Sequence, residues 1–124
     1  MRQDEHVEAV ALIRWVRLST AKFPVLALLY HVPNGGNRNR TVAAKLKAEG
    51  VKPGVSDYCL PAARGGFFGL YIELKSQPGQ VRKSQREFLD LVRAEGNRGE
   101  VAFGWIQARA ILIDYINQPK TRVA

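Results

Sequence analysis

The sequence predicts an α/β fold in which helices and strands alternate along most of its 124 residues. Residues 70–75 alternate strictly between apolar and polar side chains, which is the period of a strand with one buried face. Apolar side chains instead recur at helical spacing over residues 5–18 and again over residues 108–116. The predicted order of elements is α, β, α, β, β, α, β, α, with no internal repeat.

The first half of the chain contains three of these elements. A helix is predicted over residues 5–18, and the apolar run 25–30 is short enough to be a buried strand. Turn-forming residues dominate 31–36, and a short helix is then predicted over 41–49. Thr41 is the expected cap of that helix, and Gly50 is expected to end it in a left-handed conformation.

The second half is predicted to contain a hairpin and a helix–strand–helix unit. Residues 55–60 and 69–75 have strand character, and the linker between them includes Gly65 and Gly66, so a hairpin is expected. Residues 84–87 have the form of a capping box that starts a helix ending at Gly96. A strand over 100–106 and an amphipathic helix over 108–116 complete the prediction.

The composition indicates one domain with a preference for polyanions. The chain is too short for two ordinary domains, so we expect a single domain over residues 1–118 and a flexible tail over 119–124. Nineteen Lys and Arg residues against eleven Asp and Glu residues give a formal net charge of +8. This surplus favours nucleic acid as a partner, although charge alone does not identify an enzyme.

Cysteine and histidine are scarce. Cys59 is the only cysteine, which excludes an intrachain disulfide, and His6 and His31 are too few to complete a usual structural zinc site. The N-terminus is unlike a signal peptide, and the apolar run at 25–30 is too short to span a bilayer. We therefore expect a protein of the reducing cytoplasm, which would be that of the host cell if the protein is encoded by a phage.

The alternation in residues 70–75 brings two charged side chains together. Glu73 and Lys75 point to the same face of the predicted strand, and a hairpin would set Asp57 opposite Glu73. Two carboxylates with backbone carbonyls and water form an oxygen-rich site suited to Mg²⁺ or Mn²⁺. A solvated outer strand face and a turn aspartate would give the same three-residue pattern without any chemistry.

Longer motifs favour the chemical interpretation. Residues 54–57, followed by 69–75, resemble the PD-(D/E)XK nuclease signature, with Ser56 in place of the proline. More narrowly, residues 31–38, residues 50–54 and Gln85 at the start of the next helix resemble the virus-type replication-repair nuclease (VRR-NUC) family, in its stand-alone, phage-type form. The resemblance extends from about residue 5 to residue 115.

This resemblance implies a restriction-endonuclease-like core, with a mixed central sheet flanked by helices. It implies Mg²⁺ or Mn²⁺ held by Asp57 and Glu73, with Lys75 as the catalytic lysine and Gln85 as a residue that supports the site. An acidic residue of the first helix also belongs to the pattern, and Glu5 matches better than the alternative, Glu8. The implied function is a structure-selective DNA endonuclease similar to Holliday-junction resolvases and acting as a homodimer.

Two basic clusters are candidates for contact with DNA phosphates. The first follows the turn at 31–36 and the second surrounds the start of the helix at residue 84; any single member could equally be an ordinary solvated charge. The clusters consist of Arg38, Arg40, Lys45, Lys47 and Lys52, and of Arg82, Lys83 and Arg86.

Other candidates are assigned structural roles, and two other functions stay open. His31 is expected to pack in its loop, and Trp15 and Trp105 lie in apolar periodic segments typical of core residues. The first alternative function is a noncatalytic, basic DNA-binding module. The second is a restriction-type endonuclease that cuts duplex DNA.

Overall fold

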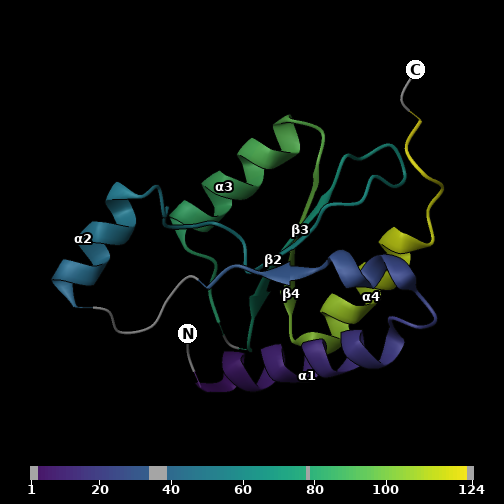
Figure 1. Cartoon of the computed structure of the whole chain (residues 1–124), viewed down its shortest axis with the longest axis horizontal. Helices are drawn as coiled ribbons and strands as arrows, with labels where there is room; N and C mark the ends of the chain where they lie inside the picture. The colour runs from purple at the N-terminus through teal and green to yellow at the C-terminus, as the bar shows by residue number, and fades with distance from the viewer. Residues whose placement is uncertain (1–2, 34–38, 78, 123–124) are drawn as a thin grey trace.

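The computed structural model describes residues 3–33, 39–77 and 79–122, and Figure 1 shows their arrangement. Helices and strands alternate along the chain, as the sequence predicts. The elements are α1 (Gln3–Ser19), the 3₁₀ helix η1 (Pro24–Leu28), β1 (Tyr30–His31), α2 (Arg40–Ala48), β2 (Tyr58–Leu60), β3 (Leu70–Lys75), α3 (Lys83–Ala94), β4 (Arg98–Phe103) and α4 (Trp105–Ile116).

The four strands form one mixed sheet in the order β1-β2-β3-β4. β1 and β2 are antiparallel, β2 and β3 form the predicted antiparallel hairpin, and β4 lies parallel to β3 after the α3 crossover. The predicted α/β architecture, a mixed central sheet flanked by helices, is therefore confirmed. The start of β2, the end of β3 and the end of β1 meet at one end of this sheet.

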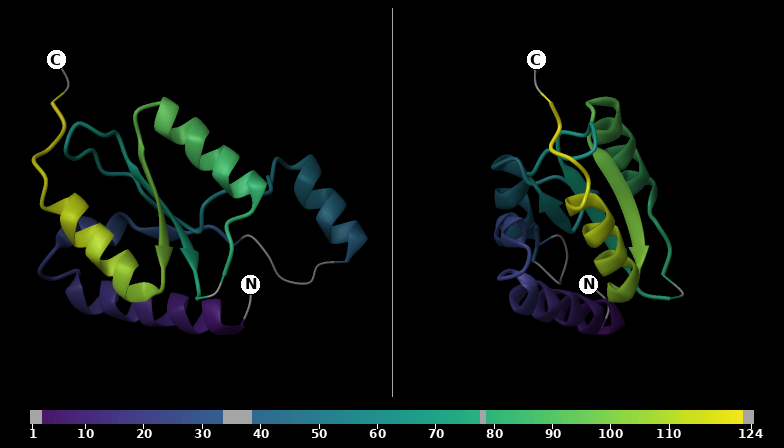
Figure 2. Two further views of the ribbon diagram at one scale, coloured as in Figure 1. Left: turned by 180° about the vertical axis from the view of Figure 1, so that it is seen from behind. Right: turned by 90° about the vertical axis from the view of Figure 1, so that its right-hand side faces the viewer.

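One face of the sheet packs against α1 and α4. Ile72 and Leu74 on β3 join Leu12 of α1 and Leu112 of α4 in a single apolar cluster, and each of these side chains is at most 1% exposed. Complete burial of an aliphatic side chain contributes roughly 1.5–3 kcal/mol to the free energy of folding. In Figure 1 the strands run between this helical layer and α3, and the second view in Figure 2 shows the same layers from the side.

α3 covers the opposite face of the sheet. The ring of Phe88 meets the ring of Tyr71 edge to face, with 5.8 Å between their centroids. A side chain at Gly99 on β4 would touch Leu89, so the absence of a Cβ allows α3 to approach the strand closely. The predicted alternation on β3 is thus correct, because Tyr71 and Glu73 face α3 whereas Ile72 and Leu74 face α1 and α4.

The strand predicted over residues 25–30 is wrong for most of its length. Pro24 has no backbone N–H to donate to a neighbouring strand, but it is tolerated in the first turn of a helix. The run accordingly begins at Pro24 as the 3₁₀ helix η1. Within η1 only Leu26 is buried, and Leu28 remains 50% exposed. The strand that follows, Tyr30–His31, lies at the edge of the sheet.

Two predicted helix caps are shifted. Asn39, not Thr41, caps α2, because its side-chain oxygen accepts a hydrogen bond from the backbone N–H of Val42 at 2.8 Å. The cap of α3 is Arg82 and not Ser84, and the side-chain oxygen of Gln85 accepts from the backbone N–H of Arg82 at 2.8 Å. Each predicted cap residue is therefore already inside its helix.

Strand ends also differ from the prediction. The second strand begins only at Tyr58, and the last strand is Arg98–Phe103 instead of residues 100–106. Gly104, with φ at +92°, turns the chain so that Trp105 already starts α4. The expected left-handed glycine after α2 is present, because Gly50 has φ at +103°.

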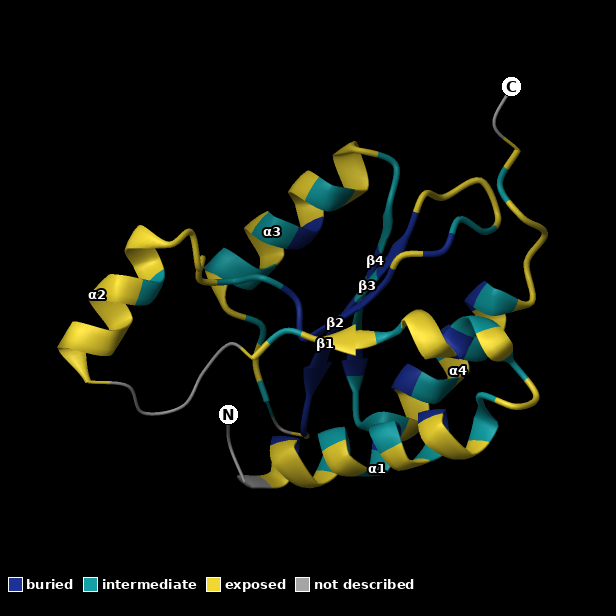
Figure 3. Ribbon diagram, in the orientation of Figure 1, coloured by how far each residue is buried: buried dark blue, intermediate teal, exposed yellow. Residues whose placement is uncertain are grey.

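The outer parts of the fold are α2 and the C-terminal segment. None of the residues of α2 is buried, and Figures 1 and 3 show this helix projecting from the body of the molecule. The segment after Gln118, where a flexible tail is predicted, hydrogen bonds to the β2–β3 linker, through the carbonyl of Pro119 to Gly65 and through Thr121 to Phe67. No helix in the described ranges has the length and apolar character needed to cross a membrane.

Glu8 fixes the position of α1 against α4. One of its carboxylate oxygens accepts a hydrogen bond from the backbone N–H of Trp105 at 2.7 Å, at the first residue of α4. This N–H has no partner within its own helix, and a negative charge at a helix N-terminus is favourable. Gly104, the residue at the cap position, provides no side chain for the task.

We expect Glu8→Ala to lower the free energy of unfolding by about 1 kcal/mol, because it leaves this N–H without its acceptor. Urea denaturation monitored by circular dichroism measures the change. Glu8→Gln keeps an acceptor oxygen and should lose less, and the exposed Glu95→Ala is the surface control. Equal stability of Glu8→Ala and Glu95→Ala would show that the contact does not hold α4.

Candidate active site

Two carboxylates lie side by side at the end of the sheet where β2 begins and β3 ends. Glu73 on β3 is 2% exposed, and Asp57, directly before β2, is 7% exposed. One carboxylate oxygen of Asp57 accepts from the backbone N–H of Leu74 at 2.7 Å. The backbone carbonyl of Asp57 accepts from the N–H of Val32 at 2.7 Å and lies 2.9 Å from Nδ1 of His31. Both the backbone and the side chain of Asp57 are therefore fixed by neighbouring strands.

The electrostatics of this pair are unfavourable for two negative charges. Burial, followed by the charge of Asp57 and its hydrogen bond to Glu73, raises the pKa of Glu73 to about 9, and Lys75 only partly opposes this rise. Within the described part of the chain, Oε2 of Glu73 is buried and has no hydrogen-bond partner. A buried acceptor of this kind is costly unless a positive group or a proton meets it.

Gln85 links the start of α3 to this pair. Its side-chain N–H donates to Oε1 of Glu73 at 3.2 Å, while its side-chain oxygen accepts from the backbone N–H of Arg82. The amide is therefore held from both ends, which fixes which of its atoms faces the carboxylate. Gln85 thus contacts one of the two carboxylates, and its site-supporting role stays a prediction.

Lys75 and Glu5 meet beside the carboxylates. The ammonium of Lys75 lies 3.9 Å from a carboxylate oxygen of Glu5, and both side chains are largely buried. Glu5 belongs to the first turn of α1, which reaches across the end of β3. Glu8, the alternative acidic residue, instead caps α4, so the structure brings Glu5 and not Glu8 to the site.

A cleft of about 320 Å³ opens onto Asp57 and Glu73. Its walls are formed by α2, by the turn that precedes β2 and by the start of α3. Three of the predicted basic residues line it, namely Lys47, Lys52 and Arg82. The cleft therefore combines an acidic floor with a basic rim.

The other predicted DNA-binding residues do not line this cleft. Arg40 and Lys45 are exposed on α2, and Lys83 forms a surface ion pair with Glu87 at 3.5 Å. The guanidinium of Arg86 donates to the carbonyl of Val81 at 2.7 Å. Arg38 lies outside the described residues.

Sequence reasoning missed two residues that shape the site. His31 was expected only to pack in its loop, yet its ring contacts the backbone of Asp57 and lies 5.0 Å from the ring of Tyr58, centroid to centroid. Gly54 has φ at +86°, and a Cβ there would collide with the carbonyl of Ser84. The glycine in the predicted motif signals the second contact. His31 opens the motif at residues 31–38, but nothing in that motif indicates a contact with Asp57.

Comparison with known proteins gives consistent results. A family model described as the VRR-NUC domain matches residues 5–104. A solved structure described as a VRR_NUC domain protein is similar, with a TM-score of 0.81 and 27% identity over 97% of this chain and 93% of that chain. No curated protein matches. Because the family model covers most of the sequence, the chain belongs to the VRR-NUC family, and this membership implies a nuclease-type function with DNA as the partner.

Proposed function

We propose that the protein is a metal-dependent, structure-selective DNA endonuclease that hydrolyses phosphodiester bonds in branched DNA such as Holliday junctions. The observation that carries the proposal is the buried Asp57–Glu73 pair at the floor of a basic cleft. Two carboxylates in contact, one with a pKa raised to about 9, form an environment that favours a bound cation.

The residues present fit Mg²⁺ or Mn²⁺. Oε2 of Glu73 is buried and has no hydrogen-bond partner among the described residues. The site also contains a second carboxylate, and these cations prefer hard oxygen ligands of this kind. Asp57 and Glu73 are the proposed protein side-chain ligands, and no group of three or more Asp, Glu, His or Cys side chains in the described ranges is arranged to hold a metal. When bound, the cation polarises the scissile phosphate and lowers the pKa of a water molecule.

The chain's own residues orient the ligands and the substrate. Gln85 donates a hydrogen bond to Oε1 of Glu73, and Oε2 has no hydrogen-bond partner among the described residues. The ammonium of Lys75 is proposed to stabilise the charge that develops on the phosphate or to orient the attacking water. Glu5, 3.9 Å from that ammonium, is proposed to set its position.

The basic rim is proposed to bind the phosphates of the DNA. Lys47, Lys52 and Arg82 line the cleft itself, whereas Arg40, Lys45 and Lys83 would meet phosphates farther along the duplex. Arg38 is proposed for the same role from the sequence alone. The net charge of +8 supports such an extended contact.

The primary test is cleavage of an end-labelled four-way junction beside its matched linear duplex, with Mg²⁺ or EDTA. We expect paired, metal-dependent cuts in the junction. Glu73→Ala should abolish them, and Gln85→Ala should slow them by about 10–100-fold, because it removes the partner that orients a ligand. Glu95→Gln removes an exposed carboxylate and is the matched control.

The other outcomes separate the alternatives. Binding without any cleavage would replace this proposal with a noncatalytic DNA-binding module. Discrete cuts on linear duplex DNA would instead indicate a restriction-type endonuclease.

Metal binding can also be measured by thermal unfolding, without a cleavage assay. We expect the midpoint of thermal unfolding to rise by about 5 °C when Mg²⁺ reaches about ten times its dissociation constant, because the cation binds the folded state selectively. The wild-type protein and Glu73→Gln are compared against EDTA by differential scanning fluorimetry. An equal rise in Glu73→Gln would contradict the assignment of Glu73 as a ligand.

We propose that residues 1–118 act as one domain in the cytoplasm, and that two copies form a homodimer. Two symmetric incisions in a junction require two active sites at a fixed separation. Light scattering at the concentration used for cleavage should therefore give the mass of a dimer, free or bound to the junction. A monomeric mass in both states, with paired cutting retained, would contradict the dimer.

A further inference from the structure

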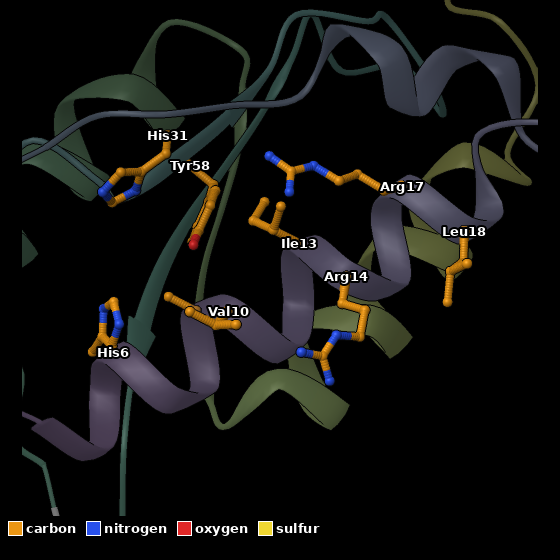
Figure 4. A pocket seen from close by; sticks show the side chains of 9 residues that line it. His6, Val10, Ile13, Arg14, Arg17, Leu18, His31 and Tyr58 are labelled. Carbon is orange, nitrogen blue, oxygen red and sulfur yellow. The ribbon is translucent and has the colours of Figure 1, made fainter.

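Another hollow lies away from the carboxylates, on the other face of the sheet. It measures about 560 Å³ and lies between α1 and the β1–β2 edge. Asp57 and Tyr58 are consecutive, so their side chains project to opposite faces, with Asp57 in the cleft and Tyr58 in this hollow. We call it the α1 pocket; Figure 4 shows the side chains that line it.

The inner wall of the α1 pocket is apolar and aromatic. Val10 and Ile13 project from α1, and the ring of Tyr58 lies against the ring of His31. A flat ring with polar edges, such as a nucleobase, matches a wall of this kind.

The rim of the α1 pocket is basic. His6, Arg14, Arg17 and His31 line it, and its lining, all of it within the described residues, includes no carboxylate. Neither Arg14 nor Arg17 forms an ion pair within the ranges that the structure describes, whereas Arg93 and Arg98 are both paired. From His6 to Arg17 the helix extends about 17 Å, at about 1.5 Å per residue. The two guanidinium groups are therefore available to an anionic ligand.

The α1 pocket and the active site share one end of the sheet. The ring of His31 lines the pocket and also contacts the backbone of Asp57. On α1, Glu5 meets Lys75 while the next residue, His6, lines the pocket. A DNA strand bound at the carboxylates and extending across this end of the sheet would therefore meet the α1 pocket next.

We propose that the α1 pocket binds an unpaired nucleotide of the DNA strand that is cut. The base lies against His31, Val10 and Ile13, and the flanking phosphates meet Arg14 and Arg17. This inference rests on the proposed endonuclease function and narrows its substrate to DNA with an unstacked or single-stranded segment next to the scissile bond. A continuous duplex presents no free base to such a pocket.

A second copy of the chain is the competing occupant. A symmetric contact through the α1 pocket would bring Arg14 and Arg17 of one copy close to the same residues of the other. Like charges without a counter-ion oppose such an interface, whereas a nucleic-acid strand supplies the complementary charge. Charge complementarity therefore favours the nucleotide.

The test measures binding of a fluorescent oligothymidine of about ten nucleotides in EDTA, over a series of salt concentrations. Arg14→Gln/Arg17→Gln should weaken binding about tenfold and reduce the slope of log affinity against log salt by about 1.4, since each single-strand phosphate contact accounts for about 0.7. Lys120→Gln/Arg122→Gln removes the same charge from the exposed C-terminal segment and should leave the slope unchanged. Circular dichroism verifies that both variants are folded.

A cross-link tests the location directly. With 5-iododeoxyuridine in the single-stranded arm of a junction, irradiation should link the strand to His31, the exposed ring of the pocket, as mapped by mass spectrometry. Cross-links confined to residues 47–55, or equal effects of the two double variants, would overturn the proposal. The proposal would also be overturned if Arg14→Gln/Arg17→Gln changed the mass measured by light scattering but left strand binding unaltered. That result would assign the pocket to a second copy of the chain.

The two proposals fail separately. If the wild-type protein binds the strand through Arg14 and Arg17 but cuts no DNA with Mg²⁺ or Mn²⁺, the endonuclease function is wrong and the pocket assignment stands. If junctions are cut and both double variants bind equally, the pocket assignment is wrong and the endonuclease function stands.

Discussion

The contact between Asp57 and Glu73 is the constraint on which the rest of the structure depends. Burying two carboxylates together is unfavourable, and the pKa of about 9 for Glu73 expresses that cost. The fold offsets it with directed contacts: the N–H of Leu74 to Asp57 and the amide of Gln85 to Glu73. Both contacts come from backbone and side chains that are themselves fixed, so the pair keeps its geometry.

Three segments hold the Asp57–Glu73 pair: β1, α3 and the turn before β2. β1 provides His31, whose neighbour Val32 donates to the backbone of Asp57, and α3 provides Gln85. Gly54 lets the turn before β2 lie directly against the first residues of α3. Because these contacts join segments far apart in the chain, the active site and the packing of α3 on the sheet depend on each other.

α1 has several separate roles along its length. In its first turns Glu5 meets Lys75 and Glu8 caps α4, while Leu12 and Val16 fill the core beneath β3. Its outer side presents Arg14 and Arg17 to the α1 pocket. A single helix thus contributes to the proposed catalytic site, the core and the proposed nucleotide site.

Local sequence patterns predicted the α/β class, the β2–β3 hairpin and the shared face of Glu73 and Lys75, because strand alternation and turn chemistry are local. The predicted hairpin also placed Asp57 opposite Glu73, and family motifs added Gln85. Helix caps and the η1 segment were misassigned, because neighbouring candidates such as Asn39 and Thr41 compete within two residues. Only the tertiary structure decided that Glu5 and not Glu8 reaches the site, that His31 contacts Asp57, and that Lys52 lines the cleft whereas Lys83 does not. Those outcomes depend on how α1, β1 and α3 pack around one end of the sheet, and no local pattern encodes that packing.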